Sequence, residues 1–527
     1  MPLWWLLMAA GLVVVLAVIG RRSVAAAARE TGAALARDAR RAGALHIVAL
    51  LVLVGVGVWL RLEFYDVPMR WDESYTFVTY ASRHLDDILR SYDPNNHVLN
   101  TLLMHVSYVL FGDGWRVLRA PVFFSGVLLV PAAYFASARL WGRQAALIVA
   151  ALVAASAQLV EYATNARGYE IETLLAVLLL LLAPQLLRST NPTYWGLFSV
   201  AAALGFYTVP VFAYPFGAIV LALLTAALVG QSSLPLRRFV PALAASVVAS
   251  VAFAALLYGP IAGDVLRLVD PNRSLGGAPG GGGRASGAYS ADALSVWREV
   301  WHLWMLAIPG YAQDVLLVGF TFSIAGVAFW RRGPFPLAFS LAALGGLLLV
   351  ADRVVTFTRV WLALLPLFLA VAIGGLIGWP PIRRILERRA FDLPVAAAAV
   401  AIAVSLAVKV RDERLANVGY SPLPSADLIA GYVVPRLQPG DVLVVDSTAA
   451  PVEQYSFFRL GRSVYSVVGT IPPAPTGRVY LVVNELVGES LSTAITAAGG
   501  SPDVAVDSKK LVEFPGAAVY ELRSAKE

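Results

Sequence analysis

The chain has 527 residues, 58% hydrophobic and 14% charged, whereas soluble domains carry roughly 45–50% and 25%, and this composition excludes a soluble globule. Its net charge of +7 does not indicate a nucleic-acid partner, because the arginines stand between apolar runs instead of covering one face. The absence of cysteine excludes disulfides, thiol nucleophiles and iron–sulfur clusters.

Apolar runs predict membrane-spanning helices, because a bilayer core about 30 Å thick needs about 20 mostly apolar residues per helix. The runs lie near residues 3–20, 45–60, 117–138, 144–161, 170–187, 194–209, 211–229, 239–259, 312–330, 335–351, 360–378 and 394–409. We therefore predict an α-helical polytopic membrane protein with about 12 transmembrane helices. Residues 1–44 would form an N-terminal anchor and a basic cytoplasmic linker, and residues 45–409 the main transmembrane domain.

Residues 98–111 (VLNTLLMHVSYVLF) are apolar but short, so they fit either a span or an interfacial helix. If this segment lies on the surface, most of the arginine groups share one side of the membrane, among them Arg41, Arg143 and Arg238. The excess of positive charge in cytoplasmic loops therefore favours a juxtamembrane helix. Residues 61–116 then form one large extracytoplasmic loop.

After Lys409 the composition changes, and short β-branched runs alternate with helical stretches. This pattern predicts a small α/β domain over residues 410–527. The orientation derived from the arginines places it on the same extracytoplasmic side as the 61–116 loop.

Two polar motifs stand in the large loop. RWDESYTF carries Asp72 and Glu73, whose adjacent carboxylates suit either catalysis or the capping of a loop helix. YDPNNHVLN carries Asn96 and His97 directly before the juxtamembrane helix, where they can contact a ligand or cap the helix.

Further polar groups lie at later extracytoplasmic ends of the spans. VEYATNARGYEIE contains Tyr162, Asn165, Arg167 and Tyr169, and DRVVTFTR contains Arg359. An arginine at this depth either binds phosphate or extends its head group into the interface. Because ionisable groups collect at one side instead of mid-span, a proton-coupled transporter is disfavoured.

The order of these motifs resembles that of the polyprenyl-phosphate-dependent GT-C glycosyltransferases, and is most similar to the protein O-mannosyltransferase and lipid A aminoarabinose transferase group. The resemblance covers roughly residues 45–380 and rests on the loop DE, the half-helix after it, LRAPVFFSG, YATNARGY and FTRVWLALLP. It implies a GT-C-like catalytic domain over 45–409. Relatives often have His-Pro-Pro or Lys-Pro-Pro where this chain has PNNH, and Glu where it has Asn165.

The resemblance also implies roles for single residues. Asp72, with Glu73 beside it, is expected to take the proton of an acceptor hydroxyl. Arg119, Arg167 and Arg359 are expected to bind the lipid phosphate and offset its growing charge. Substrate contacts are expected from a polar set comprising His97, Asn96, Tyr162, Asn165 and Tyr169. A divalent cation between Asp72, Glu73 and His97 is a further hypothesis, although their spacing shows no ligand pattern.

We thus predict an inner (cytoplasmic) membrane enzyme that transfers a sugar, with inversion, from a polyprenyl-phosphate carrier to an acceptor hydroxyl on the outer face. Its partners would be the lipid-linked sugar donor, membrane lipid and an envelope acceptor that is a glycan, lipid or protein. The main alternative is a membrane transporter or lipid flippase, which would require polar residues along the spans. A non-enzymatic scaffold that recruits partners through its tail is a third interpretation.

Overall fold

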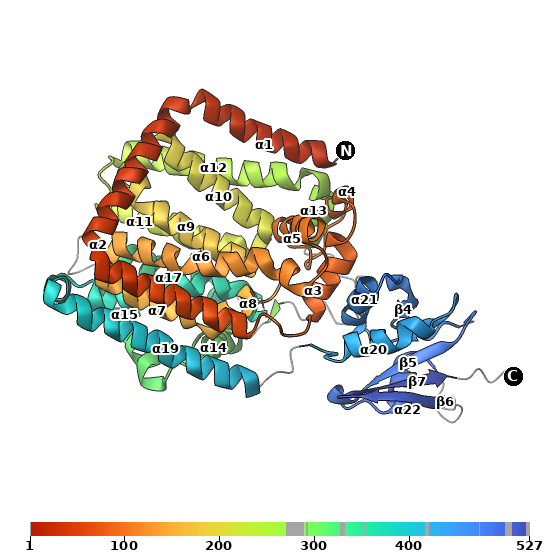
Figure 1. The fold of residues 1–527 in the computed structure, drawn as a ribbon. Helices are drawn as coiled ribbons and strands as arrows, with labels where there is room; N and C mark the ends of the chain where they lie inside the picture. Colours follow the sequence, from red (N-terminus) through yellow and green to blue (C-terminus); the bar gives the residue numbers. More distant parts are fainter. Residues whose placement is uncertain are drawn as a thin grey trace.

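The structure is a computed structural model that describes residues 2–269, 289–290, 293–326, 333–351, 354–355, 357–416, 421–473, 475–500 and 508–522. Most of these residues are helical, and the long helices run side by side in a bundle (Figure 1). The small sheet near the C-terminus lies beyond one end of the bundle. The predicted fold class, a helical membrane protein with a small C-terminal α/β region, is confirmed.

Among the described residues, seven helical segments are long and apolar enough to cross a membrane. These are Gly43–Glu63, Trp115–Trp141 (α6), Tyr169–Leu186 (α9), Pro210–Leu228 (η2 and α11), Leu236–Leu266 (α12 to α13), Thr358–Ile377 (η6 and α17) and Arg389–Glu413 (η7 and α19). A bent pair, α7 (Arg143–Ala155) and α8 (Ala157–Ala163), makes an eighth span if its two parts count as one. The chain is therefore a multi-pass membrane protein.

The remaining predicted runs also form helices, but these are shorter or fall outside that count. They are α1 (Pro2–Ile19), α10 (Pro192–Thr208), α15 (Gly310–Ala325) and α16 (Phe335–Ala351). The last four residues of the run predicted at 312–330 lie outside the described residues. The total of twelve spans stays a prediction.

The second helix, α2 (Arg21–Glu63), is bent where the predicted linker meets the predicted span. Gly43 has φ 78°, ψ 162° at the bend, a conformation that residues with a Cβ rarely adopt. The basic part before Gly43 runs across one end of the bundle, and the apolar part after it runs along the bundle (Figure 1). We call the end crossed by residues 21–42 the arginine end.

The opposite end carries the short elements of the 61–116 segment, and we call it the loop end. They are α3 (Trp71–Thr76), the π-helical turn η1 (Phe77–Ala81), α4 (Leu85–Ile88) and α5 (Val98–Phe111). Figure 1 shows α5 nearly end-on while the long helices lie in the plane, so α5 crosses the bundle end. This is the orientation expected of a juxtamembrane helix.

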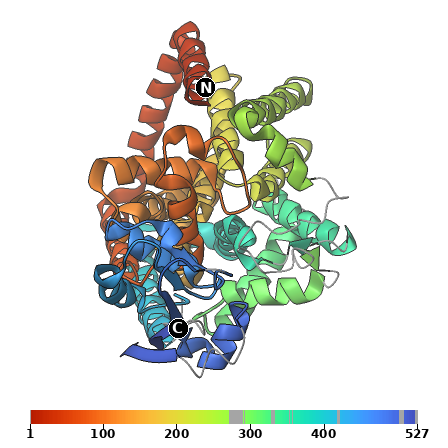
Figure 2. The same cartoon turned by 90° about the vertical axis from the view of Figure 1, so that its right-hand side faces the viewer.

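The C-terminal residues form a five-stranded mixed sheet in the order β4 (Val467–Val468), β3 (Val442–Val444), β5 (Val479–Asn484), β7 (Ala517–Leu522), β6 (Ser508–Phe514). β3 pairs in parallel with β4 and β5, and β7 pairs antiparallel with β5 and β6. Helices α20 (Ala426–Val433), α21 (Ala450–Arg459) and α22 (Leu491–Ala497) accompany it. Figure 2 looks at the loop end with this blue region in front of the orange α3–α5 segment.

Two hydrogen bonds tie this region to the loop end. The indole N–H of Trp71 donates to the carbonyl of Ser447 (3.2 Å), and the hydroxyl of Tyr455 donates to the carbonyl of Asp113 (2.7 Å). Helix α21 also packs directly on α3. The C-terminal region therefore lies on the same side of the bundle as the 61–116 segment.

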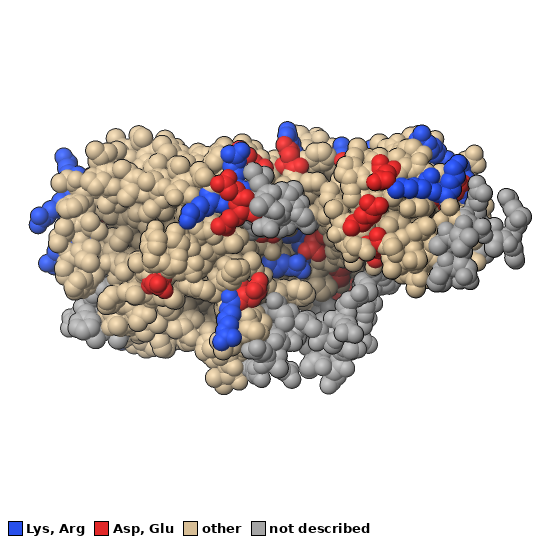
Figure 3. All heavy atoms as spheres, turned by 90° about the horizontal axis from the view of Figure 1, so that it is seen from below, with Lys and Arg blue, Asp and Glu red and all other residues tan. Residues whose placement is uncertain are grey.

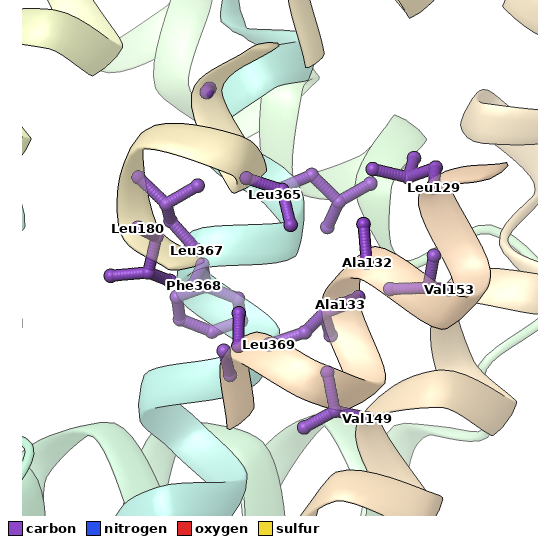
Figure 4. Close-up of a cluster of buried hydrophobic side chains, with 14 of the residues drawn as sticks. Leu129, Ala132, Ala133, Val149, Val153, Leu180, Leu365, Leu367, Phe368 and Leu369 are labelled. Carbon is purple, nitrogen blue, oxygen red and sulfur yellow. The ribbon is translucent and has the colours of Figure 1, made fainter. Parts of the chain in front are cut away.

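The bundle core is built from small and branched apolar side chains on α6, α7, α9 and α17. Figure 4 shows Ala132 and Ala133 of α6 facing Val149 and Val153 of α7, with Leu365 to Leu369 of α17 on the other side. Alanine and glycine let membrane helices approach closely, and a Cβ on Gly375 would lie 1.9 Å from the Gly319 carbonyl of α15. This packing holds fixed the helix ends that carry the polar motifs.

Candidate active site at the loop end

Helix α3 presents two adjacent carboxylates to different surroundings. The helix follows Arg70, whose backbone N–H donates to Oε1 of Glu73 (2.9 Å). Consecutive helical residues point about 100° apart, so Asp72 and Glu73 point in different directions. Glu73 is fully buried, whereas the side chain of Asp72 keeps 22% of its surface exposed.

Glu73 forms a buried ion pair with Arg119 of α6. Nε of Arg119 donates to Oε2 of Glu73 (3.0 Å), Nη2 donates to Oε1, and the backbone N–H of Ala166 donates to Oε2 (2.9 Å). Burial raises the pKa of Glu73, but the charge and hydrogen bonds of Arg119 outweigh it, so the pKa is lowered. Glu73 thus joins α3, α6 and the 162–169 segment.

Arg119 has no donor left for a ligand. Its other N–H groups bond to the backbone carbonyls of Tyr65 (2.8 Å), Val67 (2.7 Å) and Pro68 (3.3 Å). With the two bonds to Glu73, these contacts use all five donors of a guanidinium, and the side chain is fully buried. The structure therefore removes Arg119 from the expected phosphate-binding set and gives it a structural role.

Asp72 faces Arg359, which η6 (Thr358–Leu364) brings to the loop end. The Asp72 Oδ2 to Arg359 Nη1 distance is 3.1 Å, and Arg359 keeps 29% of its side chain exposed and hydrogen-bonds Tyr169. Burial raises the pKa of Asp72, but the charges of Arg167, Arg359 and Arg70 outweigh it and lower the pKa. Asp72 is therefore an ionised, partly exposed carboxylate at neutral pH.

Arg167 is held beside this pair, and one of its three guanidinium nitrogens has no hydrogen-bond partner in the described residues. Its Nη1 donates to the Asn95 carbonyl (3.1 Å), Nη2 lies 3.1 Å from Nε2 of His97, and Nε is buried without a hydrogen-bond partner in the described residues. Nδ1 of His97 accepts the Gly168 N–H (2.9 Å). Burial, Arg167 and Arg359 lower the pKa of His97 well below its usual value, so the ring is neutral.

The expected substrate-contact residues divide into two groups. Tyr162 and Tyr169 stack edge to face at 5.4 Å, and Tyr169 also meets the His97 ring at 4.7 Å, so these rings lie beside the Asp72–Arg359 pair. Asn165 is buried beside them, with its Oδ1 unpaired in the described part of the chain. Asn96, in contrast, is buried and donates to the Ile88 and Ser91 carbonyls, which holds the loop instead of facing the pair.

Two further residues shape this site: Arg70, which the motifs did not single out, and Asp93 of the YDPNNHVLN motif. Arg70 contributes positive charge to both carboxylates, and its position directly before WDE was the available signal. Asp93 accepts the hydroxyls of Tyr75 (3.0 Å) and Tyr80 (2.5 Å) on Oδ2 and two backbone N–H groups on Oδ1. Asp93 therefore organises the loop that carries His97, and raises the pKa of Tyr75, together with burial, to about 12.

The described residues give the hypothesis of a divalent cation between Asp72, Glu73 and His97 no support. No group of three His, Cys, Asp or Glu side chains able to hold a metal occurs among the described residues. Glu73 is occupied by Arg119, and both ring nitrogens of His97 face N–H donors. Asp72 alone offers exposed carboxylate oxygen, and three arginines surround it, so the site suits an anion better than a divalent cation.

Figure 3 shows a hollow between the bundle and the C-terminal region in which acidic and basic side chains gather, whereas most of the bundle surface on this face carries neither. This hollow lies where the C-terminal region meets the loop end of the bundle.

Comparison with solved structures relates this arrangement to known proteins, although no family model and no curated protein matches the sequence. The apo crystal structure of ArnT from Cupriavidus metallidurans superimposes with a TM-score of 0.55 at 14% identity, covering 90% of this chain and 97% of that one. ArnT bound to undecaprenyl phosphate gives 0.49 at 15% identity, over 91% and 98%. The oligosaccharyltransferase AglB from Archaeoglobus fulgidus, in complex with an inhibitory peptide and a dolichol-phosphate, gives 0.44 at 13% identity, over 87% and 72%. The match to apo ArnT extends over nearly the whole of both chains, and the protein therefore has the GT-C fold of ArnT.

Proposed function

We propose that this protein transfers a sugar from a polyprenyl-phosphate carrier to an acceptor hydroxyl at the loop end. The observation that carries the proposal is the ionised, partly exposed Asp72 paired with Arg359 and flanked by Arg167. A general base and cationic groups for a phosphate thus stand together at the end of the spans. ArnT, whose fold the chain shares, has been solved with undecaprenyl phosphate, which supports this donor class.

The reaction follows from the chemistry of these groups. Asp72 accepts the proton of the acceptor hydroxyl while the oxygen forms a bond to the anomeric carbon. The bond from that carbon to the phosphate oxygen breaks, and polyprenyl phosphate leaves as a stable anion without a second, acid carboxylate. A single displacement of this kind inverts the anomeric centre.

The two arginines have different tasks in this proposal. Arg359 is partly exposed, so a donor phosphate can compete with Asp72 for its Nη1, which would release the carboxylate for the acceptor. Arg167 is buried and has its unpaired Nε within the same cluster. Charge-assisted bonds from both would offset the charge that grows on the leaving phosphate.

The membrane side is inferred from charge. The basic part of α2 and the arginines after α6, α9 and α17 lie at the arginine end, and positively charged ends favour the cytoplasm. The loop end would then be extracytoplasmic, in the inner membrane of the cell. The acceptor would be an envelope glycan, lipid or protein.

A transporter or flippase is less well supported, because the polar groups gather at the loop end. Fully buried acidic and basic side chains within the apolar spans include Arg61 of α2, Arg119 of α6 and both Glu170 and Glu172 of α9, all near that same end, and Arg61 pairs with Glu170 at 3.9 Å. A polar lining along the spans would be the contrary observation.

The test is sugar transfer by purified protein from a panel of radiolabelled polyprenyl-phosphate sugars. We expect Asp72→Asn to lower kcat by roughly 10²–10⁴-fold, as removal of a general base does, and Arg359→Gln to weaken donor use. Asp66→Asn is the matched control, because Asp66 is an exposed carboxylate of the same loop that pairs with Arg116. Wild-type turnover by Asp72→Asn would overturn the assignment of the base.

A further inference from the structure

A charged cavity lies at the arginine end, at the opposite end of the bundle from the candidate active site. Its volume is about 690 Å³, within the range of roughly 300–1,000 Å³ usual for small-molecule sites. The basic part of α2, the turn between α6 and α7, the end of α9 and α18 (Pro380–Leu386) enclose it. Five arginines line it, namely Arg37, Arg139, Arg143, Arg188 and Arg383.

The acidic residues of the lining do not neutralise these arginines. Only Glu30 and Glu387 are acidic among the lining residues of this cavity, and each already has a partner: Glu30 accepts the Tyr194 hydroxyl (2.9 Å) and Glu387 accepts Nε of Arg383 (2.8 Å). Arg143 pairs with Asp392 at 2.7 Å. Arg37 and Arg188 are exposed and have no ion pair within the described part of the chain. An excess of positive charge thus faces the cavity.

The position of the cavity points to a membrane component as the ligand. The spans α6 and α9 end at its wall, so it lies at the depth of lipid head groups. Phe135, Ala138 and Pro184 supply apolar wall beside the arginines. Arginine binds phosphate through paired charge-assisted hydrogen bonds, and basic pockets between helices on the cytoplasmic side suit anionic head groups.

We propose that this cavity binds the phosphate head group of an anionic phospholipid, with Arg37 and Arg188 as its exposed ligands. Such a lipid would fix the basic part of α2, which crosses the arginine end before the bend at Gly43, against the ends of α6 and α9. The site is separate from the loop end and does not depend on the proposed reaction.

The test measures binding of phosphatidylglycerol to the full chain in nanodiscs or detergent by native mass spectrometry, with phosphatidylcholine of the same acyl chains as the neutral lipid. The double variant Arg37→Ala/Arg188→Ala is compared with Arg29→Ala/Arg384→Ala. The control pair comes from α2 and α18, two of the elements that enclose the cavity. Both residues are exposed and lie outside its lining, and the variant loses the same charge.

We expect the cavity variant to bind phosphatidylglycerol roughly 25-fold more weakly than the wild type, about fivefold for each charge removed, and the control variant to bind it as the wild type does. An equal loss in both variants would overturn the proposal, because it would indicate general surface attraction. Displacement of phosphatidylglycerol by an equal concentration of glycerol phosphate or inorganic phosphate would also overturn the proposal, because it would indicate a soluble ligand. Thermal unfolding of the lipid-free variants, and the milder Arg37→Gln/Arg188→Gln pair, separate binding from folding.

Discussion

At the scale of single residues, Asp72 and Glu73 show how neighbouring carboxylates acquire different tasks. Glu73 is closed off by Arg119 and by two backbone N–H groups, whereas Asp72 meets a partly exposed arginine. A lowered pKa is common to both, but only one of the two carboxylates is open to a substrate. The proposed role of general base therefore belongs to Asp72, the carboxylate that a substrate can reach.

Glu73→Gln should destabilise the protein strongly. The substitution leaves the Arg119 guanidinium buried without its counter-charge, and breaking a buried pair by removing one partner costs about 3–5 kcal/mol. Thermal unfolding in detergent measures the effect. Asp66→Asn, which breaks an exposed pair in the same loop, should leave the midpoint nearly unchanged. Equal midpoints for both variants would contradict the structural role of Glu73.

The pH dependence of transfer should report the charges around Asp72. Because Arg167, Arg359 and Arg70 lower its pKa, Asp72 stays ionised as pH falls, and the acidic limb of kcat/KM should lie below the ordinary aspartate value of about 3.9. Arg359→Gln removes one of these charges and should move that limb to higher pH. A pH–rate profile of both proteins measures the shift, and an unmoved limb would show that Asp72 is not the titrating group.

The lowered pKa values also determine how the stability of the fold changes with pH. A carboxyl group with a lowered pKa in the folded state contributes stability above its unfolded pKa, and this contribution is lost as pH falls through the folded value. Both Asp72 and Glu73 follow this rule. The loop end should therefore loosen only in strongly acidic solution.

At the scale of elements, the joint between α8 and α9 decides where Arg167 and His97 lie. Gly168 precedes α9, and its φ of −67° is open to any residue, but a Cβ there would lie 2.5 Å from Cγ2 of Thr208 and 3.1 Å from His97. Space, and not backbone conformation, requires glycine at this joint.

Gly168→Ala should therefore push His97 away from Arg167 and weaken use of the donor. Overpacking costs about 1–3 kcal/mol in stability. The rate of sugar transfer should fall by more than the accompanying loss of folded protein explains. Gly217→Ala on α11 is a suitable control, because a Cβ there meets nothing within 4 Å. Measuring KM for the donor and the unfolding midpoint of each variant distinguishes displacement of the site from general destabilisation.

At the scale of the whole molecule, the two ends of the bundle should face different compartments. The chain has no cysteine, so single cysteines report their own exposure. Leu428 is 54% exposed on the C-terminal region, which contacts α3 at the loop end, and Arg29 is exposed at the arginine end.

Leu428→Cys should react with a membrane-impermeant maleimide in intact cells, whereas Arg29→Cys should react only after permeabilisation. The physical reason is the excess of arginine at one end of the bundle, because positively charged ends of membrane helices are retained in the cytoplasm. Labelling by gel shift measures the result, with the cysteine-free parent as the blank. The reverse pattern would invert the proposed topology and place the transfer in the cytoplasm.

Much of this molecule follows from the sequence by itself. Long apolar runs determine where membrane helices form, since a backbone in lipid must satisfy its own hydrogen bonds. The short run at 98–111 and the arginine pattern predict a helix across one end, and the motif order indicates the residues that meet there. Asp72, Arg167, Arg359, His97, Tyr162 and Tyr169 do lie together.

Only the tertiary structure decided which of these charged groups remain open. Arg119 and Arg359 are the same residue type near the same loop, yet Arg119 exhausts its five donors on Glu73 and three carbonyls while Arg359 keeps part of its surface exposed. The charged cavity at the arginine end is likewise assembled from segments that are far apart in the chain. Burial and hydrogen-bond saturation depend on how helices pack, and a linear pattern does not encode which donors that packing uses.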